Sequence, residues 1–174
     1  MKTLVVYESM FGNTESIARA IASGLESQSD VEVHDVLDVP PEAVRAADLI
    51  VAGGPTHAFS MSRPSTRADA VKQGAPQRDA ATGLREWLAE LGSTPHTALV
   101  ATFDTRVDKV RHLPGSAARS AFKTVHRLGS HTAAKPHSFY VSDTRGPLLA
   151  GETDRAKAWG ETLAAELKAH HSRV

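Results

Sequence analysis

The stretch Leu4-Val5-Val6-Tyr7-Glu8-Ser9-Met10-Phe11-Gly12-Asn13-Thr14, residues 4–14, carries the clearest structural signal in the chain. It opens with a four-residue apolar run typical of a β-strand, and a turn at Gly12-Asn13 follows. After the turn, apolar residues recur at helical spacing up to Leu25. The stretch therefore predicts a strand, a tight loop and a helix in direct succession.

The same alternation continues along the chain. Further strands are predicted at residues 31–36, 48–52, 97–103 and 137–141, the last together with 131–133. Helical patterns follow Pro40 and cover residues 84–91, 117–128 and 159–167. Strands that alternate with helices pair in parallel, and right-handed crossovers place helices on both faces of the sheet. We therefore expect an α/β, doubly wound, five-stranded parallel sheet in a single domain, residues 1–174.

Composition excludes several classes of function. The 174 residues are 41% hydrophobic and 23% charged, as in one soluble domain, and no apolar run approaches the roughly 20 residues that cross a bilayer. We therefore expect no membrane insertion and a cytoplasmic location. The absence of cysteine excludes disulfides and thiol catalysis. Twenty basic and twenty acidic residues cancel, so no nucleic-acid partner is expected, and the nine histidines lack metal-ligand spacing.

Charge is nevertheless distributed unevenly. Residues 55–81 hold four Lys or Arg against two Asp, and residues 102–128 hold six against two. Both segments follow the ends of predicted strands. Ligands of doubly wound sheets bind beyond the carboxyl ends of the strands, so we expect positive charge on the ligand side.

The loop Ser9-Met10-Phe11-Gly12-Asn13-Thr14 is the first candidate site. Gly12 allows a tight turn and a close approach to a ligand, and the helix that follows presents free N–H groups suited to a phosphate. The loop holds no lysine, and neither G-x-G-x-x-G nor G-x-x-x-x-G-K-[ST] occurs in the chain, which disfavours a Rossmann dinucleotide site and a nucleotide triphosphatase. The alternative is a plain turn in which Asn13 or Thr14 caps the helix.

This loop resembles the phosphate loop of the flavodoxin family, [ST]-x-T-G-x-T, at Ser9, Gly12 and Thr14. Phe11 departs from that pattern and is similar to the aromatic residue in flavodoxin-like quinone reductases, whose loop reads roughly S-M-Y-G-H. The strand end Gly53-Gly54-Pro55-Thr56 adds to the resemblance. The family fold implies the strand order 2-1-3-4-5 and the cofactor FMN.

The resemblance also implies which residues hold FMN. The phosphate would lie against Ser9, Met10, Phe11, Gly12, Asn13 and Thr14. The flavin ring would be bordered by Gly54, Pro55, Thr56, His57, Ala58, Phe59, Phe103, Asp104, Thr105 and Arg106. The loop after the fourth strand lacks the Tyr or Trp that commonly stacks on the ring. Phe59, His57 and Phe103 are the nearby substitutes.

Two further expectations concern the basic segments. The cations Arg63, Arg67, Arg106, Lys109 and Arg111 are expected around the ring, where positive charge makes the midpoint potential less negative. Screened, solvated arginines are the alternative. Residues 60–80 are longer than an ordinary structureless connection, so they predict a functional lid or a partner-binding loop.

The resemblance implies an FMN-binding electron-transfer protein that serves a redox partner protein or a small quinone. The cofactor does the redox chemistry, so no catalytic side chain and no metal ligand is assigned. Two alternatives remain. One is an FMN-dependent NAD(P)H/quinone oxidoreductase, and the other is a flavin-free, flavodoxin-like interaction module.

Overall fold

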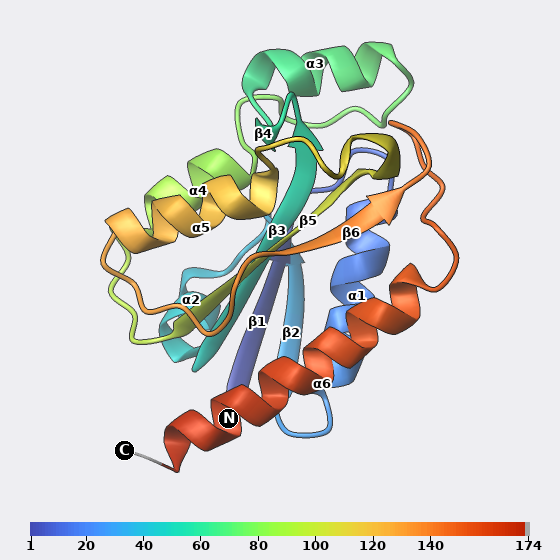
Figure 1. The fold of residues 1–174 in the computed structure, drawn as a ribbon. Coiled ribbons are helices and arrows are strands. Elements are labelled where there is room, and N and C mark those ends of the chain that lie inside the picture. The colour runs from blue at the N-terminus through green and yellow to red at the C-terminus, as the bar shows by residue number, and fades with distance from the viewer. Residues whose placement is uncertain (173–174) are drawn as a thin grey trace.

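The predicted alternation of strands and helices is present in the computed structural model, which describes residues 1–172 (Figure 1). The strands are β1 (Lys2–Tyr7), β2 (Asp30–Asp35), β3 (Leu49–His57), β4 (Ser60–Met61), β5 (Leu99–Val107) and β6 (His137–Val141). The helices are α1 (Asn13–Leu25), α2 (Pro41–Ala46), α3 (Pro64–Lys72), α4 (Leu84–Leu91), η1 (Asp108–Val110), α5 (Ala117–Arg127) and α6 (Glu152–His171).

Five parallel strands form the sheet in the order β2-β1-β3-β5-β6. This confirms the order 2-1-3-4-5 expected for five strands, because β4 only forms a short antiparallel hairpin with β3. Residues 131–133 do not extend the last strand. They contribute one isolated bridge, between Thr132 and Val100.

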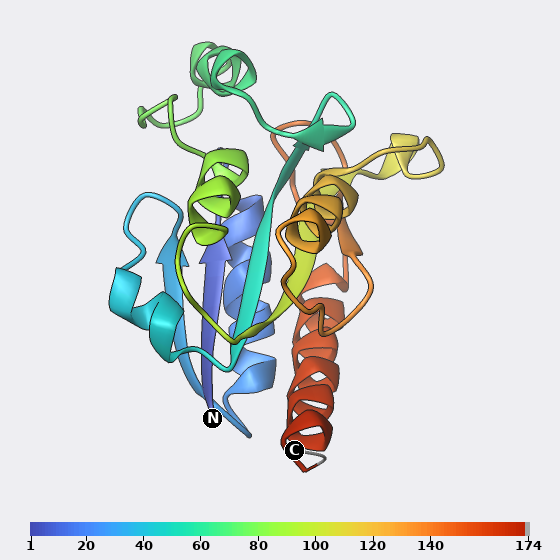
Figure 2. The same ribbon diagram turned by 90° about the vertical axis from the view of Figure 1, so that its left-hand side faces the viewer.

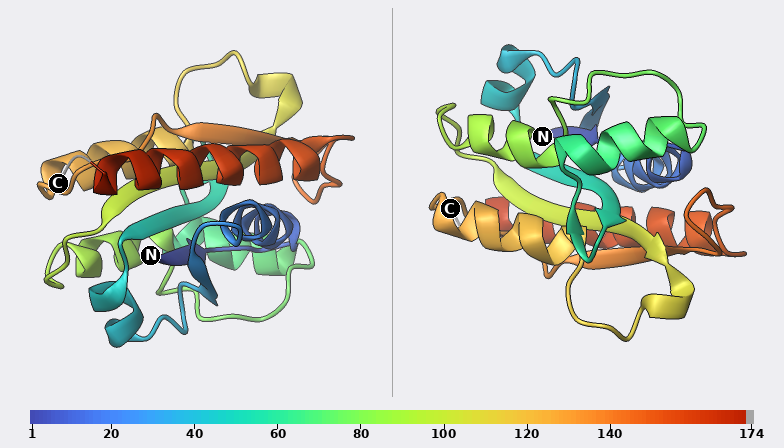
Figure 3. Two further views of the ribbon diagram at one scale, coloured as in Figure 1. Left: turned by 90° about the horizontal axis from the view of Figure 1, so that it is seen from below. Right: turned by 90° about the horizontal axis from the view of Figure 1, so that it is seen from above.

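Each face of the sheet supports its own hydrophobic core (Figures 2 and 3). Along β1, Leu4 and Val6 face the core that contains α2, α4 and α5, whereas Val5 and Tyr7 face the core that contains α1 and α6. Successive side chains of a strand point to opposite faces, so a continuous apolar run fills both cores.

Helices α1 and α6 cross at a pair of glycines. A Cβ atom at Gly24 would lie 2.1 Å from the carbonyl oxygen of Lys157, and one at Gly160 would lie 2.2 Å from that of Ile21. Only glycine fits at such a backbone contact. The crossing fixes α1, and therefore the position of its N-terminus above the sheet.

The segment 60–80 is not a structureless loop. It contains β4 and α3, and α3 lies across the carboxyl end of the sheet (Figure 1; Figure 3, right). Pro64 occupies the first turn of α3, and Thr66 Oγ1 accepts a hydrogen bond from the Arg63 N–H at 2.9 Å. The helix has few buried positions, so its sequence carries little of the apolar periodicity that reveals a helix.

Candidate functional site

A pocket opens at the carboxyl ends of β1, β3 and β5, where the strand order changes direction. Its lining residues are Ser9, Met10, Phe11, Asn13, Thr14, Pro55, Thr56, His57, Thr105, Arg106, Val107, Val141 and Thr144. The structure thus brings together ten of the residues that the sequence assigned to a cofactor. The enclosed volume is about 70 Å³. A ligand of FMN size would therefore be only partly enclosed, with the remainder at the mouth.

The loop after β1 forms the inner end of this pocket. Gly12 precedes α1 with a φ of 91°, and no side chain caps the helix. Neither Asn13 nor Thr14 serves as a cap, since Asn13 Nδ2 donates to the carbonyl of Arg145 at 3.1 Å and Thr14 Oγ1 bonds Thr105 Oγ1 at 2.8 Å. The plain capped turn considered from the sequence is therefore wrong.

The first-turn amides of α1 are consequently available to a ligand. Within residues 1–172, the N–H groups of Asn13, Thr14 and Glu15 have no protein acceptor. A Cβ atom placed on Gly12 would meet nothing within 4 Å, so the space beside the turn is open. Free amides at a helix N-terminus carry a partial positive charge, which suits a phosphate or another oxyanion.

The same loop is held in place by residues that the sequence did not single out. Arg78 donates to the carbonyl of Ser9 at 2.8 Å and pairs with Asp35 at 3.0 Å. Met10 is buried against Ala70 and Ala75, on and beyond α3. The role of Arg78 could not be predicted from a local sequence pattern, because both of its partners lie more than 40 residues away in the chain.

The end of β3 forms the second wall. His57 lines the pocket, and its Nδ1 hydrogen-bonds with Thr66 Oγ1 of α3 at 3.0 Å. Burial lowers the pKa of His57, the charge of Arg67 lowers it further, and Glu8 opposes the shift. The neutral imidazole is therefore favoured.

Ala58 and Phe59, expected beside the ring, lie in the turn between β3 and β4 and not in the pocket lining. Both have positive φ, 47° and 61°, and the Phe59 side chain is 45% exposed. Phe59 therefore points to solvent at the hairpin tip.

Arg106 contributes the only arginine among the pocket-lining residues that the structure describes. It is 5% exposed, and its Nη2 donates to the carbonyls of Val110 at 2.8 Å and Leu113 at 3.3 Å. Its Nε atom is buried and has no hydrogen-bond partner. Buried polar groups are normally paired, so this donor fits a ligand acceptor in the adjoining pocket.

Three residues expected at the ring lie behind the pocket instead. Phe103 is 0% exposed and packs edge-on against Phe139 and Trp159 in the α1–α6 core, so it cannot stack on a ligand. Asp104 is buried beneath α5, where its carboxylate accepts from the Ala118 N–H at 2.8 Å. Burial raises the pKa of Asp104. Gly54 is buried against Leu84. These corrections share one cause, because β3 and β5 extend to His57 and Val107, beyond their predicted ends.

Arg67 also differs from expectation. It is 0% exposed and lies away from the pocket, donating to the carbonyls of Ala80 at 2.8 Å and Ala81 at 3.2 Å and pairing with Glu86 at 3.0 Å. The expectation that its charge surrounds a ring is therefore wrong. Arg63, Lys109 and Arg111 are exposed.

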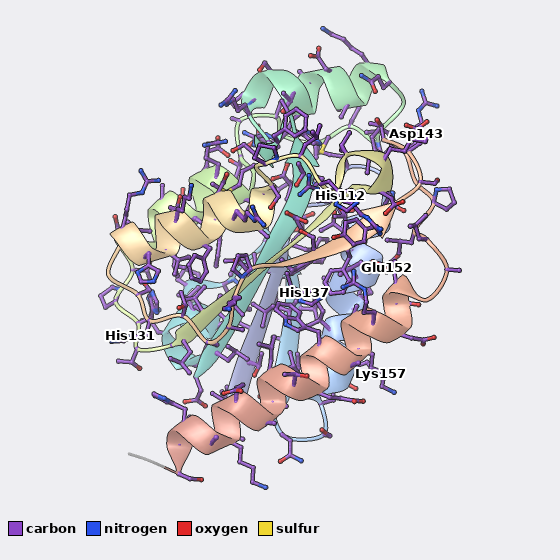
Figure 4. The ribbon with its side chains drawn as sticks, in the orientation of Figure 1. His112, His131, His137, Asp143, Glu152 and Lys157 are labelled. Atoms are coloured by element: carbon purple, nitrogen blue, oxygen red, sulfur yellow. The ribbon has the colours of Figure 1, made fainter. Side chains whose placement is uncertain are left out.

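The pocket also contains residues that the sequence analysis missed: Val107, Val141 and Thr144. Figure 4 shows Asp143, the neighbour of Thr144, beyond the end of β6. Parallel pairing of β5 with β6 brings Val141 beside Val107. The sequence could have indicated these residues, because the carboxyl ends of parallel strands lie at the same edge of the sheet. The residues that follow β6 are therefore expected beside the same pocket.

Across residues 1–172, no three or more potential metal ligands cluster together. No helix in that range combines the length and the apolar character required to span a bilayer.

Comparison with known proteins adds to this picture. Residues 5–85 match the sequence model of the flavodoxin family. The fold is similar to that of a flavodoxin from the domain Archaea, with 22% identity and a TM-score of 0.69 over 97% of this chain and 99% of that one. It is also similar to Flavodoxin 2 from Bacillus cereus, with 20% identity and a TM-score of 0.62 over 98% and 99%.

A third similar structure is the flavodiiron protein from Giardia intestinalis, at 14% identity and a TM-score of 0.65. That match covers 99% of this chain but only 37% of the other. The same fold therefore also occurs as part of a longer protein. The chain therefore resembles the flavodoxin family in sequence over residues 5–85, and it shares the flavodoxin fold across nearly its whole length.

Proposed function

We propose that this protein binds FMN and transfers electrons to or from a redox partner. The observation that carries the proposal is the loop 9–14, where three first-turn amides have no acceptor among residues 1–172 and the space beside Gly12 is open. A bound FMN would supply reversible electron transfer, and the chain would supply its binding and its electrostatic surroundings.

The proposed contacts follow the pocket lining. The phosphate would lie on the lining residues Ser9, Met10, Phe11, Asn13 and Thr14 and on Gly12 within the same loop. The ring would face Pro55, Thr56, His57, Thr105 and Arg106. Arg106 Nε would donate to a carbonyl oxygen or nitrogen of the ring, which would satisfy its buried donor. Its positive charge at short range supports a midpoint potential less negative than acidic surroundings would give.

The free amides of the loop 9–14 define the test, because they should bind a phosphate and not a flavin ring. FMN and riboflavin share the ring and differ by the phosphate. Fluorescence titration of the purified protein should show that FMN binds at least about 100-fold more tightly than riboflavin, because the phosphate supplies charge-assisted hydrogen bonds to the free amides. Equal affinity for the two, or no quenching of either, would refute the proposal.

A second candidate is an FMN-dependent NAD(P)H/quinone oxidoreductase. The small enclosed volume supports it, because a ring left at the mouth is open to a diffusible substrate. Steady-state oxidation of NADPH by a soluble quinone distinguishes the two candidates. Turnover above about 1 s⁻¹ without a partner protein favours the oxidoreductase.

A further inference from the structure

The segment 109–142 has an unusual charge composition. It contains Lys109, Arg111, Arg119, Lys123, Arg127 and Lys135 together with four histidines, and it contains no Asp or Glu. The whole chain is neutral, so this run concentrates cationic charge in one part of the molecule. Such concentrated charge creates a local potential that the net charge does not reveal.

The structure places much of this charge near the pocket. The segment begins in η1, at the end of β5 that carries Arg106 and Val107, and continues through α5 (Figure 1). Lys109, Arg119 and Lys123 are exposed. Among residues 1–172, none of these three has a carboxylate within 4 Å.

Helix α6 lacks this bias. It carries four acidic residues against three Lys or Arg, and its Arg155 pairs with Glu152 at 2.7 Å. Figure 4 shows Lys157 on this helix, on the side of the molecule away from α5. Helix α6 therefore does not share the cationic character of the η1–α5 side.

Two exposed apolar side chains accompany these cations. Phe59 is 45% exposed at the β3–β4 hairpin tip, and Leu113 is 48% exposed in the loop after η1. The two segments touch, because a Cβ atom on Gly115 would lie 2.7 Å from the Phe59 carbonyl oxygen. Apolar groups surrounded by charged ones are typical of protein interfaces.

We infer that this surface, made of Phe59, Leu113, Lys109, Arg119 and Lys123, docks a redox protein with an acidic surface. The inference rests on the proposed function and names the class of its partner. In the docked complex the reduced member gives one electron to the oxidised member, so that the bound flavin and the partner's redox centre exchange roles without further reactants. Opposite charges speed the encounter, and the apolar pair provides contact area near the pocket.

The alternative polyanions are nucleic acid and anionic membrane. The apolar pair and the position next to the pocket favour a protein, because an electron donor or acceptor must approach the flavin closely. The neutral net charge also argues against general binding to polyanions.

A plant-type [2Fe–2S] ferredoxin, which is acidic, serves as the probe. Its affinity for the FMN-saturated and the FMN-free protein is measured by fluorescence anisotropy at 20 and 200 mM NaCl. Salt should weaken the complex, because screening shortens the reach of exposed charges. In the doubly reversed variant Lys109→Glu/Arg119→Glu, the Kd should rise at least about tenfold. The control Lys157→Glu should change the Kd less than twofold.

Several outcomes would overturn the inference. They are no ferredoxin binding at 20 mM NaCl, a Kd insensitive to the double reversal, and tighter binding of the basic protein cytochrome c. Tighter binding of a 20-base-pair DNA duplex or of phosphatidylserine vesicles would also overturn it in favour of that partner. FMN affinity is measured in parallel. If the wild-type protein does not bind FMN, the proposed function is refuted. If it binds FMN but does not bind the ferredoxin, only the proposed docking surface is refuted.

Discussion

The loop after β1 and the connection from Ser62 to Gly83 both pack at the carboxyl end of the sheet, yet they are built in opposite ways. The loop leaves the first amides of α1 without acceptors. The connection closes on itself around Arg67, whose guanidinium reaches the carbonyls of Ala80 and Ala81. There is no room for a Cβ atom on Gly83, which would lie 2.2 Å from Arg67 Nη1.

This difference separates the proposed binding element from a structural one. Polar groups that the protein leaves unpaired are available to a ligand, whereas groups that it pairs in the interior hold the fold. The two elements meet at Glu8, which directly precedes the loop. Its buried carboxylate accepts from Ser62 Oγ at 2.5 Å and from the Leu84 N–H at 2.7 Å. The proposed binding loop is therefore anchored, through Glu8, to the hydrogen-bond network of the structural connection.

The substitution Arg67→Met tests the structural side and should have the largest effect. It leaves Glu86 and the carbonyls of Ala80 and Ala81 without their buried partner, which should cost about 3–5 kcal/mol of unfolding free energy. Urea denaturation measures the loss. Arg63→Met, at an exposed arginine in the same connection, should change stability by less than about 0.5 kcal/mol. A loss below about 1 kcal/mol for Arg67→Met would contradict the structural role.

The substitution Gly12→Asp tests the binding side. A carboxylate beside the free amides would repel a phosphate with about 3 kcal/mol at a separation near 5 Å, so FMN affinity should fall about 100-fold. The matched control is Gly12→Asn, since Asn has the same shape, tolerates positive φ and carries no charge. Fluorescence titration compares the two variants. An affinity difference below threefold between them would place the phosphate elsewhere.

Sequence alone indicated the proposed binding element but not the structural one. The strand, Gly12 and the start of the helix all lie within the eleven residues 4–14. A local sequence pattern is therefore sufficient to indicate this loop. The role of Arg67 depends on carbonyls 13 and 14 residues away and on a fold that turns its side chain inward. No local pattern distinguishes such an arginine from an exposed one.

The strand order was predictable, whereas the strand ends were not. Continuous apolar runs identify β1, β3 and β5, but polar residues such as Thr105 and Arg106 continue β5 past its apolar part. These polar residues remain in the strand because β3 pairs with one edge of this part of β5 and β6 pairs with the other. Phe103 was therefore expected at the end of its strand, beside the ring, and lies in the core instead.

The substitution Arg78→Lys probes the contact between the two elements. Arg78 follows α3 in the connection, and its guanidinium holds the Ser9 carbonyl and the Asp35 carboxylate together. Lysine keeps the charge but cannot reproduce this forked geometry. If the less firmly held loop reduces the free energy of FMN binding by about 1 kcal/mol, the affinity for FMN falls about fivefold. Calorimetry measures it, and unchanged affinity would show that the loop is rigid without this clamp.

The smallest expected effect concerns His57, which links the pocket wall to α3 through Thr66. Burial, with the charge of Arg67 adding to it, lowers the pKa of His57 in the folded protein. As pH falls below about 6.5, the unfolded chain takes up a proton that the folded chain does not, so the free energy of unfolding decreases. In His57→Gln this contribution is absent, and stability should fall less between pH 7 and pH 5.5. His96 and His137, whose pKa values burial also lowers, retain part of the slope. Identical slopes in urea denaturation at the two pH values would mean that the wall around His57 admits water, and the ring end of the pocket would then be as open as the loop beside Gly12.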